Sequence, residues 1–133
     1  MAARAKLLSR ESLAAAPYRY FEAIDAKDLD ATMAQYAENA VETVIPENVT
    51  YQGSEEIRRM YIDFFASADA IRHQIRNVVV DPEHRKVATE QTYVGESKDG
   101  RKHDMYNCNF FEFDAEGKLE RVIIWMSGAS PLT

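Results

Sequence analysis

Four long strand-type segments follow one another in the second half of the chain, and short turn signals join them. The turns read DPEH, DG and DAEG, which have proline or glycine where tight turns favour them. Strands joined so closely pair antiparallel. Strands of about ten residues span roughly 34 Å, so the sheet is expected to curve around whatever covers it. The segments are residues 71–80, 86–96, 102–113 and 118–127.

Helical patterns precede these strands. Pro17 is expected near the start of the first helix, and Asp28 and Ser54 are expected to cap the second and third. Two short β-branched segments flank a Pro-Glu-Asn turn between the last two helices. The order predicts an α+β fold with three N-terminal helices packed on a strongly curved, mainly antiparallel sheet that ends in a four-strand meander. Apolar residues recur at helical spacing in residues 17–24, 29–37 and 57–65.

Length and charge limit the classes of function. A chain of 133 residues predicts one domain over 1–133, with 1–12 as a candidate flexible N-terminus. The net charge of −6 argues against a nucleic-acid or anionic-membrane surface. No apolar run is long enough to span a membrane, and the basic N-terminus makes a poor secretory signal. A single cysteine excludes an internal disulfide and fits the cytoplasm as the expected location.

Alternation along the strands predicts which side chains face inward. In the first long strand Ile71, His73 and the odd positions up to Val79 form the apolar face. In the third strand, Asn107 and Asn109 share a face with a methionine and two phenylalanines. A buried amide without partners costs about 1–3 kcal/mol. Either the protein or a ligand is therefore expected to satisfy this pair.

The opposite face of the third strand is also apolar, which predicts a homodimer through the outer sheet face formed by Tyr106, Phe110 and Trp125. Cys108 points away from the interior by alternation, which disfavours a nucleophilic role. His84 lies in a turn and His103 at a strand start, so both are expected to face solvent.

The chain resembles the NTF2-like superfamily in RYFEAIDAKDLDATMAQYAENAVETVIPENVTYQGSEEI and FFEFDAEGKLERVI. The likeness spans residues 17–127. This superfamily includes ketosteroid isomerases, scytalone dehydratase, SnoaL-type polyketide cyclases, limonene-epoxide hydrolases and members without catalytic activity. The resemblance implies a cone, formed by a bent sheet wrapped around helices, with a ligand cavity at its open end. It also implies dimerisation through the outer sheet face.

The resemblance to the isomerases places Tyr20 at their oxyanion-binding tyrosine and Asn109 at the protonated aspartic acid of their oxyanion hole. Val44 stands where they keep a catalytic aspartate. A SnoaL-type cyclase has an aspartate base at about the position of Asn109, and an asparagine cannot act as that base. Two familiar carboxylates are therefore missing. The Asp-Arg-Asp set of the epoxide hydrolases is not recognisable.

Similarity to scytalone dehydratase places Asp25 at its helix-one aspartate, His73 at one histidine of its catalytic pair and Asn107 at an active-site asparagine. Gln91 stands where the second histidine would be, so half of that site is present. The comparison also orients the second strand, which alternation alone leaves ambiguous. The residues that it turns inward are Val87, Thr89, Gln91 and Tyr93.

These observations favour a cofactor-independent and metal-independent isomerase, cyclase or dehydratase that acts on a hydrophobic carbonyl compound such as a polyketide, terpenoid or steroid. His73 would move a proton, oriented by Asp25, while Asn107, Asn109 and Tyr20 would hold the developing enolate oxygen. The residues expected to bind substrate are Gln91, Tyr93, Val44, Tyr51, Met60, Phe64, Met105 and Met126.

Each candidate also has a local interpretation. The histidine can be satisfied by a carbonyl or by Asp25, the amides can bond each other or water, and Tyr20 can simply be core. Asp25 can hold a turn, and apolar residues of the proposed lining are core more often than ligand contacts. The alternative function is therefore a non-catalytic dimer that binds a small ligand or a partner protein.

Overall fold

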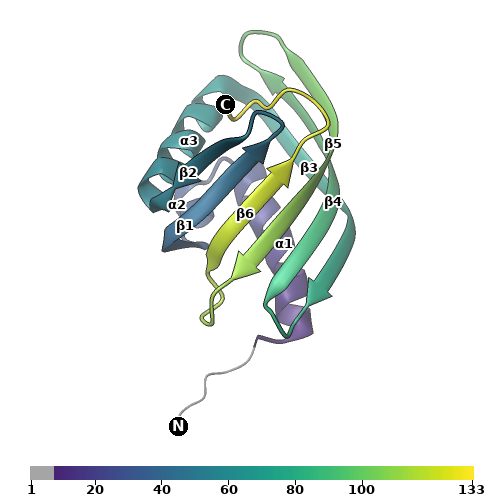
Figure 1. The fold of residues 1–133 in the computed structure, drawn as a ribbon. Helices are drawn as coiled ribbons and strands as arrows, with labels where there is room; N and C mark the ends of the chain where they lie inside the picture. Colours follow the sequence, from purple (N-terminus) through teal and green to yellow (C-terminus); the bar gives the residue numbers. More distant parts are fainter. Residues whose placement is uncertain (1–7) are drawn as a thin grey trace.

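The computed structural model describes residues 8–133 as three helices and one six-stranded sheet (Figure 1). The sheet order is β2-β1-β6-β5-β4-β3, with β1 and β6 parallel and every other pair antiparallel. The predicted α+β class and the meander of the last four strands are confirmed. The elements are α1 (Arg10–Asp25), α2 (Leu29–Met33), β1 (Tyr36–Ile45), β2 (Val49–Gln52), α3 (Gly53–Ser67), β3 (Ala68–Asp81), β4 (Lys86–Ser97), β5 (Lys102–Phe113) and β6 (Leu119–Trp125).

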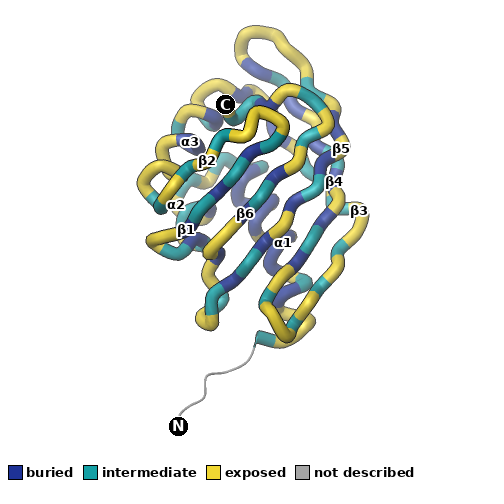
Figure 2. Tube along the Cα trace, in the orientation of Figure 1, coloured by how far each residue is buried: buried dark blue, intermediate teal, exposed yellow. Residues whose placement is uncertain are grey.

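The helices cover one face of the curved sheet, and the core lies between these two layers (Figure 1). Burial alternates along β4 and β5, so buried and exposed or half-buried positions follow one another along the strands (Figure 2). The predicted inward set of β4 is confirmed, since Val87, Thr89, Gln91 and Tyr93 are all buried. No helix in residues 8–133 is both long and apolar enough to cross a membrane.

Helix α1 begins earlier than the sequence pattern predicts. Ser9 caps it, because the Ser9 hydroxyl accepts a hydrogen bond from the backbone N–H of Ser12 at 3.0 Å. Pro17 consequently lies inside the helix instead of near its start. Of the stretch 1–12 that was expected to be flexible, residues 1–7 lie outside the described residues, and residues 10–12 form the first helical turn.

The second predicted helix is shorter than its pattern indicates. Asp28 caps α2 as expected, with its carboxylate 3.0 Å from the N–H of Ala31, but the helix ends at Met33. Tyr36 then opens β1, which pairs with both β2 and β6. Tyr36 pairs with Leu119 of β6, and this tertiary pairing overrides the helical spacing at the end of the predicted helix.

The predicted cap of α3 is also wrong by two residues. The helix begins at Gly53, which has a φ of 87°, and Ser54 lies within the helix. Gln52 occupies the cap position, and its backbone N–H donates to the Glu56 carboxylate at 2.8 Å. The start of the helix is therefore held by a glutamate in its first turns, which accepts the N–H of the cap residue, and not by a serine hydroxyl.

A bulge divides β3 into two registers. Ile75 pairs with Gln91 but Asn77 pairs with Glu90, so one residue is inserted between them. Beyond the bulge Val78 is half-buried while Asn77 and Val79 are exposed. The inward face predicted for the first half of this strand is correct, and the prediction for Asn77 and Val79 is wrong.

We expect Phe111→Ala to destabilise the fold by about 3–5 kcal/mol, because a buried aromatic ring would leave a cavity. Phe111 is fully buried, and its ring centroid lies 4.9 Å from that of Tyr20. Val79→Ala, at a side chain 67% exposed beyond the bulge, should change stability by no more than about 0.5 kcal/mol. Urea unfolding of both variants measures the difference, and equal effects would contradict this assignment of faces.

Candidate functional site

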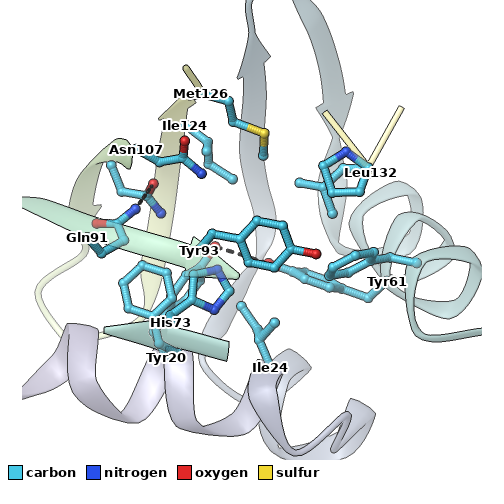
Figure 3. A pocket seen from close by; sticks show the side chains of 14 residues that line it. Tyr20, Ile24, Tyr61, His73, Gln91, Tyr93, Asn107, Ile124, Met126 and Leu132 are labelled. Atoms are coloured by element: carbon cyan, nitrogen blue, oxygen red, sulfur yellow. Dashed lines mark hydrogen bonds between the residues drawn. The ribbon is translucent and has the colours of Figure 1, made fainter. Parts of the chain in front are cut away.

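One pocket opens between α1, α3 and the inner face of the sheet (Figure 3). Its cavity volume is only about 30 Å³. The pocket is therefore narrow. No lysine or arginine of the described residues lines it. Its polar lining residues are Tyr20, Tyr61, His73, Gln91, Tyr93, Asn107 and Asn109, and its apolar ones include Phe21, Ile24, Phe64, Ile124, Met126 and Leu132.

His73 is held by Asp25 through two contacts. One carboxylate oxygen lies 2.6 Å from the ring Nδ1, and the other accepts the backbone N–H of His73 at 2.8 Å. These bonds join the last residue of α1 to β3 and fix the imidazole orientation. The ring Nε2 makes no hydrogen bond to any residue in 8–133, so it is the nitrogen available to a ligand.

Aromatic rings hold the imidazole from two sides. The centroid of the His73 ring lies 4.5 Å from that of Phe21 and 5.1 Å from that of Tyr93, at interplanar angles of 30° and 31°. Tyr93 lies close to Gly95, where a Cβ would be 2.2 Å from the tyrosine hydroxyl oxygen. Burial, together with the Asp25 charge, raises the pKa of Tyr93 to about 12, so this hydroxyl stays protonated at neutral pH.

The two buried asparagines are bonded through their side-chain oxygens, whereas Gln91 is bonded through both ends of its amide. The carbonyl oxygen of Asn107 accepts the backbone N–H of Ser127 at 3.1 Å. Thr89 donates to the Gln91 side-chain oxygen at 2.6 Å, and the Gln91 amide nitrogen donates to the Asn109 oxygen at 2.9 Å. The scaffold therefore occupies both asparagine oxygens.

The two asparagine nitrogens remain as donors. Among residues 8–133, neither the Nδ2 of Asn107 nor that of Asn109 has a hydrogen-bond partner, and both side chains line the pocket. Figure 3 shows the Asn107 amide beside Gln91, at one side of the pocket, with Tyr61 at the other. The asparagine pair does not satisfy itself, and its free N–H groups suit an acceptor oxygen on a ligand.

Three tyrosine hydroxyls form a buried cluster at the other side of the pocket. The hydroxyl oxygens of Tyr20 and Tyr61 are 3.0 Å apart, and those of Tyr61 and Tyr36 are 2.8 Å apart. Tyr36 also donates to the Glu42 carboxylate at 2.5 Å. Burial raises the pKa of each tyrosine, and the Glu42 charge raises it further, so all three stay protonated.

Glu42 is a fully buried carboxyl group that the sequence analysis missed. Its Oε1 bonds Tyr36, while its Oε2 has no partner in the described part of the chain. Burial raises its pKa to about 7. Alternation along β1 carried the signal, because Glu42 stands between the inward residues Ala40 and Val44.

The residues expected to bind substrate divide into three groups. Gln91 and Tyr93 line the pocket, as do Phe64 and Met126. Tyr51 is half-buried, and its hydroxyl donates to the backbone oxygen of Leu132 at 3.3 Å. The residues that lie in the buried core outside the pocket lining are Val44, Met60 and Met105.

The remaining histidines and the cysteine lie outside the pocket lining. His84 is exposed and contacts Asp81 at 2.9 Å, whereas His103 is only partly exposed and lies 2.9 Å from the Ser97 hydroxyl. Cys108 is half-buried and points away from the pocket, and burial raises its pKa. Within residues 8–133, no group of three or more His, Cys, Asp or Glu side chains is placed to hold a metal ion.

The chain belongs to the SnoaL-like domain family, whose profile matches residues 18–122. The NTF2-like resemblance is thereby confirmed, and solved structures share the fold. The BvnE pinacolase of Penicillium brevicompactum superposes with a TM-score of 0.79 at 19% identity, covering 92% of this chain and 89% of that one. AusH of Aspergillus nidulans gives 0.80 at 15% identity, with 92% and 88% covered.

An NTF2-like protein of unknown function from an Exiguobacterium species superposes with a TM-score of 0.74 at 16% identity, covering 85% of this chain and 98% of that one. No curated protein matches the chain. At these identities, the solved structures establish the fold and leave the reaction to be argued from the site itself.

We expect Glu42 to make stability fall as the pH rises. Its pKa is raised from 4.5 to about 7 by folding, so the folded state holds the proton more tightly than the unfolded state. The resulting penalty is absent below about pH 4.5, develops as the pH rises and is complete above about pH 7, reaching about 3 kcal/mol. Urea unfolding at several pH values should show that Glu42→Gln lacks this component. Parallel pH profiles for both proteins would refute it.

Proposed function

We propose that the protein is a cofactor-independent isomerase, cyclase or dehydratase that moves a proton on a small carbonyl compound. The observation that carries this proposal is that His73, Asn107 and Asn109 each bond the protein through one side-chain atom and keep another for a ligand. The scaffold holds Nδ1 of His73 and the oxygens of Asn107 and Asn109, and it leaves one nitrogen of each side chain for a ligand. One basic nitrogen and two neutral donors on one apolar pocket suit enolate chemistry.

In the proposed step, Nε2 of His73 takes a proton from the carbon next to the substrate carbonyl. The bond electrons move onto the carbonyl oxygen, where the amide nitrogens of Asn107 and Asn109 donate to the enolate. The Asp25 carboxylate stabilises the imidazolium. The proton then returns to a different carbon, or to a departing hydroxyl group, which gives isomerisation or dehydration respectively.

The surroundings of His73 support proton exchange with solvent. Asp25 and His73 also line an open surface groove on α1 and β3. The Asp25 side chain is 25% exposed and that of His73 is 12% exposed. The imidazole thus lies between the narrow pocket and water, so a proton taken from substrate has a short route out.

The narrow interior favours a small or flat substrate. The cavity volume is only about 30 Å³, whereas ligand pockets commonly enclose about 300 Å³ or more. A polyketide, terpenoid or steroid would need the walls to move, above all Met126 and Leu132. We therefore favour a substrate of these classes that is compact and planar, with one ring and one carbonyl group.

The same narrowness favours the second candidate function, a non-catalytic NTF2-like dimer that binds a small ligand or a partner protein. Val44 in the core, where the isomerases keep their base, also supports it. A binding protein would retain the donors of Asn107 and Asn109 but would not need the contact between Asp25 and His73. Turnover tests therefore separate the two functions.

We expect His73→Ala to abolish turnover and Asn109→Leu to lower it by about 10²–10³-fold, because the first removes the base and the second a donor to the enolate. The assay follows exchange of the carbon-bound protons of small cyclic ketones and enones in heavy water by NMR. Circular dichroism establishes that each variant is folded.

The matched controls are His84→Ala and Asn77→Leu, which change the same residue types at exposed positions. Both should exchange protons at the wild-type rate. Turnover that survives both His73→Ala and Asn109→Leu would refute the mechanism. Binding without exchange in the wild-type protein would favour the non-catalytic function.

We also propose that a second copy of the chain covers the outer sheet face. Tyr106, Phe110 and Trp125 on β5 and β6 are 50%, 42% and 38% exposed, and the ring centroids of Phe110 and Trp125 lie 5.7 Å apart. Clustered aromatic rings of this kind are typical of interfaces. The outer face is separate from the pocket, so dimerisation leaves the pocket open.

Phe110→Glu should convert the dimer to a monomer, since it would place a charge in an apolar interface. Sedimentation velocity measures the mass of each species across a concentration series. Tyr18→Glu, at an exposed aromatic residue on α1, should leave the dimer intact. A monomeric wild-type protein at high concentration would contradict the proposed interface.

A further inference from the structure

Glu42 lies at the buried end of the tyrosine cluster, and nothing in the proposed proton transfer uses it. The cluster runs from Glu42 through Tyr36 to Tyr61 and Tyr20, and the last two line the pocket. Three secondary-structure elements contribute to it: β1, α3 and α1. A carboxyl group that is fully buried with one partnered oxygen is costly, so its place at the end of a hydroxyl chain calls for an explanation.

No cation neutralises Glu42 in the part of the chain that the structure describes. The titratable groups that face it are Tyr36 on its own strand, Tyr61 from α3, Tyr20 from α1 and Tyr51 from β2. Its register partner on β6 is a valine. The tyrosine hydroxyls keep their protons, so the carboxyl group is the member of the cluster that gains or loses one.

The charge state of the carboxyl group sets the direction of every hydrogen bond in the chain. When Glu42 is ionised it can only accept, so Tyr36 donates to it and Tyr61 donates to Tyr36. Tyr20 then donates to Tyr61 at 3.0 Å, and a longer contact of 3.5 Å also joins its hydroxyl to that of Tyr36. All three hydroxyl protons then point away from the pocket. The pocket meets only oxygen lone pairs at this side.

Protonation of Glu42 reverses the chain. The carboxylic acid donates to Tyr36, Tyr36 donates to Tyr61, and Tyr61 donates to Tyr20, which leaves the Tyr20 proton free for a ligand. Each hydroxyl accepts one proton and passes its own to the next oxygen, so one proton entering at Tyr20 ends on Glu42. Proton count and charge balance without any other group.

We propose that Glu42 is a positioning residue that sets the polarity of this hydroxyl chain, so that Tyr20 offers a hydrogen-bond donor to the pocket only while Glu42 carries a proton. The inference rests on the proposed function for its value to catalysis, because a donor at Tyr20 would join the two asparagine nitrogens around an enolate oxygen. Burial supports it, since a carboxyl group in this environment titrates near neutral pH.

Infrared difference spectroscopy of the ligand-free protein between pH 5 and pH 9 tests the inference. We expect the carboxylic acid C=O band to be lost near neutral pH, together with a shift of the tyrosine C–O band, which responds to whether the hydroxyl donates or accepts. Both changes should disappear in Glu42→Gln. They should persist in Glu38→Gln, which removes an exposed charge from the same strand.

A chain-breaking variant separates polarity from simple burial. In Tyr36→Phe the carboxyl group should still titrate, while the tyrosine C–O shift should be lost. Tyr36 is the residue that links both Tyr61 (2.8 Å) and Tyr20 (3.5 Å) to Glu42, so its hydroxyl is the one that must be removed. Glutamate labelled with ¹³C in the carboxyl group moves the acid band in the wild-type protein, which keeps the test valid if Glu42→Gln does not fold.

Loss of the acid band only in the ordinary acidic range, or a tyrosine band that ignores the Glu42 titration, would overturn the inference. The spectra use no substrate, so a failure of the proposed enzyme activity leaves this result readable. A positive spectral result with no proton exchange on any ketone would instead retain the switch and reject the reaction.

Discussion

Every polar atom buried on the inner face of the sheet needs a partner, and this requirement organises the site. A buried donor or acceptor without a partner costs about 1–3 kcal/mol. The fold provides a donor for the side-chain oxygen of each asparagine: the backbone N–H of Ser127 for Asn107 and the Gln91 amide for Asn109. The other end of each amide is left unpaired where the side chain lines the pocket. The groups that could bind a ligand are therefore the polar atoms that the protein itself leaves without a hydrogen-bond partner.

The requirement also ties the site to the stability of the fold. Asp25 ends α1 and bonds both the backbone and the ring of His73 on β3, so helix and strand are positioned by the pair that would perform the chemistry. Stacking of Phe21 and Tyr93 on the imidazole restricts its rotation. A base fixed in this way needs little reorganisation when a substrate arrives, which is the condition for efficient proton transfer.

The sequence predicted the fold class and most inward faces because alternation and turn signals are local. It failed where tertiary pairing or a single inserted residue decided the outcome. The first residues of β1, Tyr36 and Ala37, read as the end of a helix until Tyr36 pairs with β6, and the bulge in β3 moves Asn77 and Val79 to the exposed side. The link between Asp25 and His73 came from family resemblance, since 48 residues separate the two side chains.

The partners of the amides and the tyrosine cluster had no local signature. Which oxygen of which amide is occupied depends on strand register and on the path of the chain after β6, where Ser127 lies. Tyr36 and Tyr61 read as ordinary members of apolar helical stripes, and their convergence on Glu42 depends on α3 packing over β1. The β-branched pattern of residues 41–45 puts Glu42 and Val44 on the same face, so alternation there could have pointed to Glu42.

The charge balance of the interior limits the conditions under which an enolate could be stabilised there. Among residues 8–133, no lysine or arginine lines the pocket. The Asp25 carboxylate bonds the lining residue His73. Glu42 bonds Tyr36, whose hydroxyl contacts that of the lining residue Tyr61. An enolate forming there would be repelled by an ionised Glu42 in a medium of low dielectric constant. A protonated Glu42 removes that repulsion and also supplies a donor through Tyr20. Enolate stabilisation by neutral donors alone is therefore compatible with this interior only in the state in which the buried carboxyl group holds its proton.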